Sequence, residues 1–191
     1  MIQYTQQLKK RAGMLALFLC LTGAGAPAIA QAQTQAQPVT AVNNVNLQDY
    51  SGTWYEIASF PAPFQPADCT GTTATYTYNT DGSIKVWNQC YQPTIAGVDK
   101  LLRVEGRAVP ANAGNSKLKV SFFGPFAGDY WVLALGENYS HALVGAPGRN
   151  YLWVLNREPE MNPDTYRQLL NIARQQGFDV SRLRRTPPRS Q

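Results

Sequence analysis

The chain has 191 residues, of which 44% are hydrophobic and 15% are charged, and its formal net charge is +5. It carries 17 Lys and Arg against 12 Asp and Glu, and three of the basic residues (Lys9, Lys10 and Arg11) lie in a predicted leader, so the mature chain has 14 − 12 = +2. The body has no basic stripe, which excludes nucleic acid as the expected partner.

Residues 1–32 are predicted to be a secretory signal peptide. The basic residues precede an apolar stretch at 12–21, and small residues then form two cleavage sequences, Ala28-Ile29-Ala30 and Ala30-Gln31-Ala32. The apolar stretch is shorter than the ~20 residues of a membrane-spanning helix. Apolar residues precede Cys20, whereas lipid attachment needs a small residue there. We therefore expect an exported, periplasmic protein rather than an outer-membrane lipoprotein.

The mature chain is divided into three parts. Residues 33–45 are rich in Gln, Ala, Asn and Thr, and this composition predicts a flexible arm. Residues 46–181 are expected to form one domain, since the 191 − 32 = 159 residues after the leader are too few for two. Residues 182–191 are predicted to be a solvated basic tail.

The body alternates between apolar and polar residues in short segments. We predict eight strands, at residues 52–58, 73–78, 84–89, 102–108, 117–122, 130–135, 141–144 and 151–155. Asp81-Gly82 favours a tight hairpin turn. Eight strands at regular spacing are typical of a sandwich or an up-and-down barrel. Several inward positions are bulky but polar-tipped (Tyr76, Asn88 and Tyr130), which favours a barrel with a cavity.

One helix follows the last predicted strand. Asn162 is suited to cap it, Pro163 to its first position, and Asp164 to its positive dipole end. An apolar stripe at i, i+3, i+4 and i+7 indicates docking on the barrel; it comprises Tyr166, Leu169, Leu170 and Ala173. Gly177 is expected to end the helix, and residues 178–180 are predicted to form a short returning strand.

Four ordered stretches make the chain resemble the lipocalin family, most closely its bacterial, apolipoprotein D-like group. They are residues 52–58, 120–126, 139–144 and 151–157. The resemblance implies an all-β fold, an eight-stranded antiparallel up-and-down barrel with one C-terminal α-helix packed outside. It also implies that Gly52, Trp54 and Arg157 close one barrel end, with the guanidinium packed across the indole. Such stacking stabilises by ~1 kcal/mol or more.

The resemblance further implies a cavity for a small hydrophobic ligand. It assigns five residues to the cavity wall: Tyr76, Asn88, Phe122, Tyr130 and Trp153. Strand alternation independently places the first four on one face. Alternation alone adds six more residues to the predicted cavity wall: Ala58, Val86, Val104, Val120, Val132 and Ala142. Each of these positions is also compatible with a filled barrel core.

Two cysteines remain in the mature chain, Cys69 and Cys90, and an even count in an exported protein indicates a disulfide. A metal site is the rival reading, but two thiols without a nearby His fall short of a zinc set. Apolipoprotein D-like proteins use a C-terminal cysteine that is missing here, which leaves Cys90 as the partner. If Thr80 pairs with Ser83, Cys90 faces Thr73 instead, so a bulge near Gly71 is required.

These observations predict a periplasmic protein that binds, stores or transports fatty acids or lysophospholipids. No cofactor, catalytic residue or metal is expected, and the resemblance allows outer-membrane contact and either a monomer or a homodimer. Two alternatives stay open. A lipocalin-type enzyme would have to use the lone His141 or the inward Glu56. A ligand-free interaction module would have a solid barrel.

Overall fold

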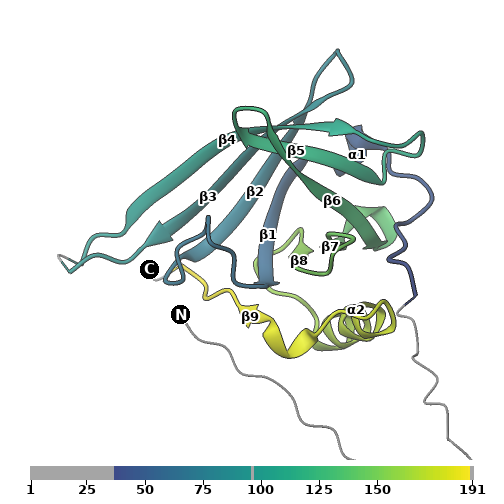
Figure 1. Cartoon of the computed structure of the whole chain (residues 1–191). Coiled ribbons are helices and arrows are strands. Elements are labelled where there is room, and N and C mark those ends of the chain that lie inside the picture. The colour runs from purple at the N-terminus through teal and green to yellow at the C-terminus, as the bar shows by residue number, and fades with distance from the viewer. Residues whose placement is uncertain (1–36, 96, 190–191) are drawn as a thin grey trace, which may run out of the picture. The chain divides into compact units, whose positions relative to one another are not determined.

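The computed structural model describes residues 37–95 and 97–189, so the predicted signal peptide and residues 33–36 lie outside the described residues. The described part contains eight strands that pair antiparallel in chain order, and β8 returns to pair with β1. The strands are β1 (Gly52–Ser59), β2 (Thr70–Tyr78), β3 (Ile84–Gln92), β4 (Lys100–Pro110), β5 (Lys117–Phe123), β6 (Phe126–Leu135), β7 (His141–Gly145) and β8 (Leu152–Asn156). The predicted closed barrel is confirmed (Figure 1).

Side chains alternate across the barrel wall as the period of two predicts. In β3, Val86 and Asn88 point inward, whereas Trp87 lies on the outer face between two cations. The Lys85 ammonium is 4.9 Å and the Arg103 guanidinium 3.9 Å from the centre of the Trp87 ring. An indole covered by cationic side chains is compatible with a solvated face.

One barrel end is closed by Trp54, which has no exposed surface. Its indole Nε1 donates to the Tyr50 carbonyl of the short helix α1 (Leu47–Tyr50) at 2.8 Å, and the Arg157 guanidinium lies 3.9 Å from the ring centre. The guanidinium also donates to three backbone carbonyls, those of Asp49, Thr53 and Tyr139. Gly52 has φ +97°, and an added Cβ would lie 3.2 Å from Arg157.

The other end is open, because Phe64 and Phe126 line the barrel interior there and are also exposed to solvent. Consecutive connections of an up-and-down barrel alternate between its two ends. The β1–β2, β3–β4, β5–β6 and β7–β8 connections therefore surround the mouth, opposite α1 (Figure 1). The connection between the strands predicted at 117–122 and 130–135 is shorter than expected. β5 runs to Phe123 and β6 begins at Phe126, so only Gly124 and Pro125 form the turn.

Helix α2 (Pro163–Gln175) packs on the outside of the barrel, as predicted (Figure 1). The Asn162 side chain accepts from the backbone N–H groups of Asp164 and Thr165, and Gly177 ends the helix with φ +79°. Leu169 and Ala173 are buried against a second apolar cluster that lies outside the barrel. That cluster includes Ile57, Ala58, Phe60, Leu143, Leu152 and Val154.

None of the helices in the described residues has both the length and the apolar character required to cross a bilayer.

The Cys69–Cys90 disulfide is confirmed, with the two Cα atoms 5.6 Å apart. The β2–β3 register is one residue away from the expected one, because Asn79 rather than Thr80 pairs with Ser83. The anticipated bulge is present: the register shifts between Thr70 and Thr73, and Gly71 has φ +55° there. The disulfide therefore depends on a glycine in the left-handed region.

Residues 37–45 contact the barrel, in contrast to the flexible arm expected at 33–45. Val39 and Val45 are buried, and the Val42 N–H donates to the Val132 carbonyl at 2.8 Å. The Thr40 N–H donates to the side chain of Gln176, the residue that follows α2 in the sequence. The segment is of low complexity, but Val39, Val42 and Val45 recur in it every three residues, and these are the residues that pack.

The C-terminal segment also differs from its prediction. Residues 178–180 do not form a strand: Phe178 packs beneath α2, and Val180 begins the 3-10 helix η2 (Val180–Arg182). The returning strand is β9 (Arg184–Arg185), which pairs with Ser59 and Ala58 of β1. The four arginines of the predicted tail are exposed, as expected, and three of them also lie on aromatic rings. Arg182 covers Phe60, Arg185 covers Tyr166 and Arg189 covers Tyr91.

Candidate ligand-binding cavity

The barrel interior is hollow. A cavity of about 720 Å³ extends from the closed end to the mouth, and its wall is mainly aliphatic and aromatic. This volume lies within the range of about 300–1,000 Å³ that is typical of small-molecule sites. A filled barrel core, which the alternation alone does not exclude, is therefore not what this chain forms.

Most of the predicted site residues line this cavity. They are Tyr76, Val86, Asn88, Val104, Val120, Phe122, Tyr130 and Trp153. Phe122 lies across Gly106 of β4, where an added Cβ would come within 2.6 Å of its ring. The glycine therefore gives the Phe122 ring its place in the cavity, an example of strand glycine used for close approach.

Ala58 is a wrong prediction, because its side chain points away from the cavity. A β-bulge lies between Glu56 and Ala58, so that Glu56 pairs with Leu155 but Ala58 pairs with Val154. The extra residue reverses the alternation, and Ala58 lies without exposed surface in the cluster under α2. A bulge changes the face of every later residue in a strand, and the strand's own pattern does not reveal it.

Val132 and Ala142 also do not line the cavity. Both belong to the buried cluster around Trp54, and neither has exposed surface. Alternation predicts the face of a residue but not its depth along the barrel. These two side chains therefore form part of the packed closed end rather than the wall of the hollow.

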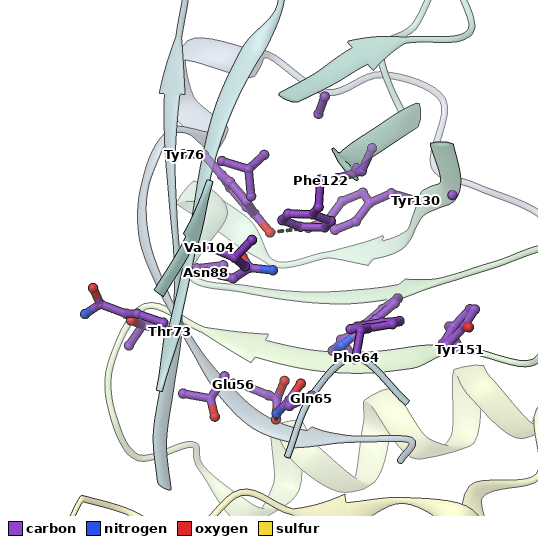
Figure 2. Close-up of a pocket in the computed structure, with 18 of the residues that line it drawn as sticks. Glu56, Phe64, Gln65, Thr73, Tyr76, Asn88, Val104, Phe122, Tyr130 and Tyr151 are labelled. Atoms are coloured by element: carbon purple, nitrogen blue, oxygen red, sulfur yellow. Dashed lines mark hydrogen bonds between the residues drawn. The ribbon is translucent and has the colours of Figure 1, made fainter. Parts of the chain in front are cut away.

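The deep end of the cavity carries three linked tyrosine hydroxyls. The Tyr130 hydroxyl lies 2.8 Å from that of Tyr50 and 3.0 Å from that of Tyr76. Figure 2 shows Tyr76 and Tyr130. Burial raises the pKa of Tyr76 to about 12 and raises the pKa values of Tyr50 and Tyr130 well above the ordinary range. All three phenols therefore stay protonated across physiological pH.

The cavity wall holds further polar atoms. Asn88 Oδ1 is buried and has no hydrogen-bond partner among the described residues, as is true of Thr73 Oγ1. Nearer the mouth, Glu56 Oε1 accepts from Ser59, from Gln65 and from Thr186 (Figure 2 shows Glu56 beside Gln65). Buried polar atoms without partners are rare in proteins, so Asn88 is a candidate contact for a ligand.

The mouth is surrounded by exposed apolar side chains. Residues on three of its four connections, or at their edges, expose half or more of their surface: Phe64, Ile95, Val98, Leu101, Phe123 and Phe126. Phe64, Phe123 and Phe126 also line the cavity, so the apolar surface continues from the inside to the outside. Contiguous exposed apolar surface is characteristic of ligand, protein or membrane contacts.

A hollow antiparallel barrel with this closure limits the families to which the chain can belong. The comparison of sequences then identifies the family. A family model described as a lipocalin-like domain matches residues 45–188. The chain belongs to the lipocalin family. This match extends past the predicted domain end at 181 and includes β9, consistent with the contacts of the C-terminal segment.

Several curated lipocalins match over most of this chain. It is 42% identical over 163 residues to temperature-induced lipocalin-1 of Arabidopsis thaliana, with 81% of this chain and 85% of the relative covered. It is 41% identical over 171 residues to the outer membrane lipoprotein Blc of Escherichia coli (strain K12), with 89% and 94% covered. Rat apolipoprotein D is 32% identical over 149 residues, with 73% of this chain and 75% of the relative covered.

Solved structures agree on the lipocalin fold. Insecticyanin from the tobacco hornworm, Manduca sexta, superposes with a TM-score of 0.63 at 21% identity, covering 82% of this chain and 87% of the other. At this identity the likeness concerns the fold alone.

Sequence reasoning missed the cavity residues that lie outside the regular strands of this lipocalin. Phe64, Gln65 and Pro66 enter from the β1–β2 connection, and Tyr50 enters from α1. Connections have no period from which a face can be predicted. The available signal was composition: an aromatic residue among prolines in a connection between strands, such as Phe64, is a candidate for the cavity mouth.

Proposed function

We propose that this lipocalin binds, stores or transports small hydrophobic ligands of the fatty acyl class, such as fatty acids and lysophospholipids. The observation that carries the proposal is the hollow of about 720 Å³, closed beneath Trp54 and open at the opposite end. Transfer of an acyl chain from water into such a wall is favourable by ~0.8 kcal/mol per buried CH₂.

The cavity suits a ligand whose tail is buried and whose headgroup reaches the mouth. Val86, Val104 and Phe122 offer apolar contacts along the barrel, and Asn88 offers an unpaired carbonyl oxygen to a polar group on the ligand. A charged headgroup is expected to stay in water at the mouth, since burying an unpaired charge is costly.

We propose the periplasm as the place of action. The predicted leader indicates export, and a disulfide is typical of an oxidising compartment. Relatives described as outer membrane lipoproteins support an envelope location. The apolar mouth favours contact with the outer membrane, because Phe123 and Phe126 would enter the lipid where a ligand is collected or released.

We infer binding rather than catalysis. His141 contacts Ser140 at 3.1 Å but is not part of the cavity wall, and burial lowers its pKa. Cys69 and Cys90 are joined to each other. Glu56 lines the cavity, but one carboxylate oxygen accepts three hydrogen bonds that connect it to neighbouring segments. The thiols and the Glu56 carboxylate thus have structural roles, and His141 lies outside the cavity wall.

Uptake of a fluorescent fatty acid tests the proposal. We expect stoichiometric binding to the purified protein and at least tenfold weaker binding after Phe122→Asp, which introduces a charge into an apolar wall. The neighbouring Ser121→Asp is the matched control: it adds the same charge on the outer side of β5 and should leave binding within about twofold. Equal binding by the Phe122→Asp protein would remove Phe122 from the site.

Mass spectrometry of the denatured protein distinguishes a carrier from a ligand-free interaction module. A carrier purified from its own cells is expected to release acyl lipids on denaturation. The absence of any released lipid, together with no uptake of the fluorescent fatty acid, would favour a module that acts through its rim.

A further inference from the structure

We propose that the closed end of the cavity recognises an uncharged oxygen atom, a hydroxyl or a carbonyl, on the end of the ligand that enters first. Among ligands of equal chain length, the site favours those with an oxygen at the innermost end, such as long-chain alcohols or methyl ketones, over those whose alkane end enters first. This inference rests on the proposed function, since it names the class of hydrophobic ligand that the same cavity selects.

Three tyrosine hydroxyls lie together at the closed end of the cavity. Tyr130 stands in the middle, 2.8 Å from the Tyr50 hydroxyl and 3.0 Å from the Tyr76 hydroxyl. The described residues provide no further hydrogen-bond partner for these three oxygens. All three side chains border the cavity, but Tyr50 has no exposed surface and lies behind the other two. Figure 2 shows Tyr76 and Tyr130 meeting beside Phe122.

A count of protons shows that one donor remains unused. Three neutral phenols carry three protons, but the chain of hydroxyls contains only two hydrogen bonds. Tyr50 has no exposed surface, so its proton must go to Tyr130 if it is to be satisfied at all. The unused proton therefore lies on Tyr76 or on Tyr130.

The donor stays a donor at physiological pH. Burial raises the pKa values of all three phenols, as described above, so none of them becomes an acceptor through ionisation. The ligand must consequently supply the acceptor, and oxygen is the common acceptor in lipids. An alkane end would leave the O–H group buried without a partner, which is unfavourable.

The surroundings favour an uncharged oxygen over a carboxylate. Arg157 is the cation of the closed end, and its guanidinium lies on Trp54 and donates to backbone carbonyls rather than lining the cavity. A carboxylate at the tyrosines would receive one neutral hydrogen bond in exchange for its hydration, which is a large net cost. Carboxylate headgroups are therefore expected at the mouth.

The hydroxyls are held in place by their rings. Tyr50 and Tyr76 stack with centroids 5.7 Å apart, Tyr76 meets Tyr130 edge to face at 6.2 Å, and Tyr130 stacks on Trp153 at 6.5 Å. A donor fixed before the ligand binds loses little conformational entropy on binding. The cluster is thus a preformed site rather than a group of mobile side chains.

Two ligands of equal chain length test the inference. Cetyl alcohol and hexadecane are titrated against dansyl-labelled undecanoic acid bound to the purified protein, and the ratio of their dissociation constants is measured. We expect the alcohol to bind about 3- to 10-fold more tightly, the range of one net neutral hydrogen bond. A ratio near one would overturn the inference and leave the proposed function intact.

Tyrosine variants make the test specific. In Tyr76→Phe the unused proton passes to Tyr130, and in Tyr130→Phe it stays on Tyr76, so each single variant should keep most of the ratio. The double variant Tyr76→Phe/Tyr130→Phe removes both hydroxyls that can carry the unused proton. Tyr50 has no exposed surface and cannot replace them, so the ratio should fall to about one. A double variant that folds, binds the dansyl probe and keeps the full ratio would exclude the tyrosines as the donor.

Two further measurements distinguish failure of this inference from failure of the proposed function. Tyr139→Phe also removes a phenol at the closed end, but Tyr139 does not line the cavity, so the ratio should not change. The infrared stretch of a bound long-chain methyl ketone should move to lower frequency in the wild-type protein and not in the double variant. Failure of the protein to bind the dansyl probe at all would reject the proposed function, and the inference with it.

Discussion

Two arginine–tryptophan stacks in this lipocalin have the same geometry and different surroundings. Arg157 lies 3.9 Å from the centre of Trp54, and Arg103 lies 3.9 Å from the centre of Trp87. Trp54 is fully buried, and the Arg157 guanidinium also satisfies three backbone carbonyls at the closed end. Trp87 is on the outer face, where water can replace the cation. Equal distances therefore do not imply equal contributions to stability.

We expect Arg157→Met to lower the free energy of unfolding by about 2–3 kcal/mol. The variant loses a desolvated cation–π contact and leaves carbonyl groups near α1 without donors. The matched Arg103→Met variant should lose less than about 1 kcal/mol, because its stack is exposed to solvent. Denaturation in urea measures both values, and similar losses in the two variants would contradict the distinction.

At the scale of one element, the bulge in β1 separates two clusters of the molecule. Residues before it, such as Trp54, face the barrel interior, whereas Ala58 after it faces the helix α2. The bulge thus lets one strand contribute both to the barrel closure and to the outer layer. A strand without it would direct Ala58 into the cavity, as the sequence pattern predicts.

Two alanine substitutions measure this difference between faces. Ala58→Leu should lower the free energy of unfolding by about 1–3 kcal/mol through overpacking under α2, while fatty acid affinity stays within about twofold. Ala108→Leu projects into the cavity and should weaken fatty acid binding by about fivefold or more. Weaker binding by the Ala58→Leu protein would place Ala58 in the cavity wall after all.

At the scale of the whole described molecule, the segments at both ends of the described residues are attached to the barrel. Val42 bonds to β6, and the C-terminal segment crosses β1 and β2. Thr186 donates to the buried Glu56 at 2.5 Å, and the Pro187 carbonyl accepts from Gly71 at 2.8 Å, beside the disulfide. The C-terminal segment therefore joins the cavity wall to the bulge that positions Cys69.

Ending the chain after Leu183 should lower the melting temperature by about 4–8 °C. The truncated protein loses β9 and the hydroxyl that donates to the buried Glu56, a change of about 2 kcal/mol. Ser181→Ala is the control nearby, since it removes an exposed hydrogen bond to Asp179 and should shift the midpoint by less than about 2 °C. Calorimetry measures both, and an unchanged midpoint in the truncated protein would mean that the segment contributes nothing.

Local patterns predicted those features that depend on neighbouring residues. The alternation placed Tyr76, Asn88 and Phe122 on the inner face, and the caps at Asn162 and Gly177 delimited α2. The pairing of Cys69 with Cys90 followed from the number of cysteines in the mature chain. Such features follow from the spacing of apolar residues, from helix caps and from the number of cysteines, all of which can be read from the sequence.

Tertiary structure decided the features that depend on segments distant in sequence. The bulge that moved Ala58 outward, the depth that placed Val132 in the packed closed end, and the arginines that lie on aromatic rings are examples. The meeting of Tyr50, Tyr76 and Tyr130 belongs to the same group, since they come from α1, β2 and β6. The physical reason is that register and contact between strands are set by pairing across the barrel, whereas a sequence pattern records only the neighbours along the chain.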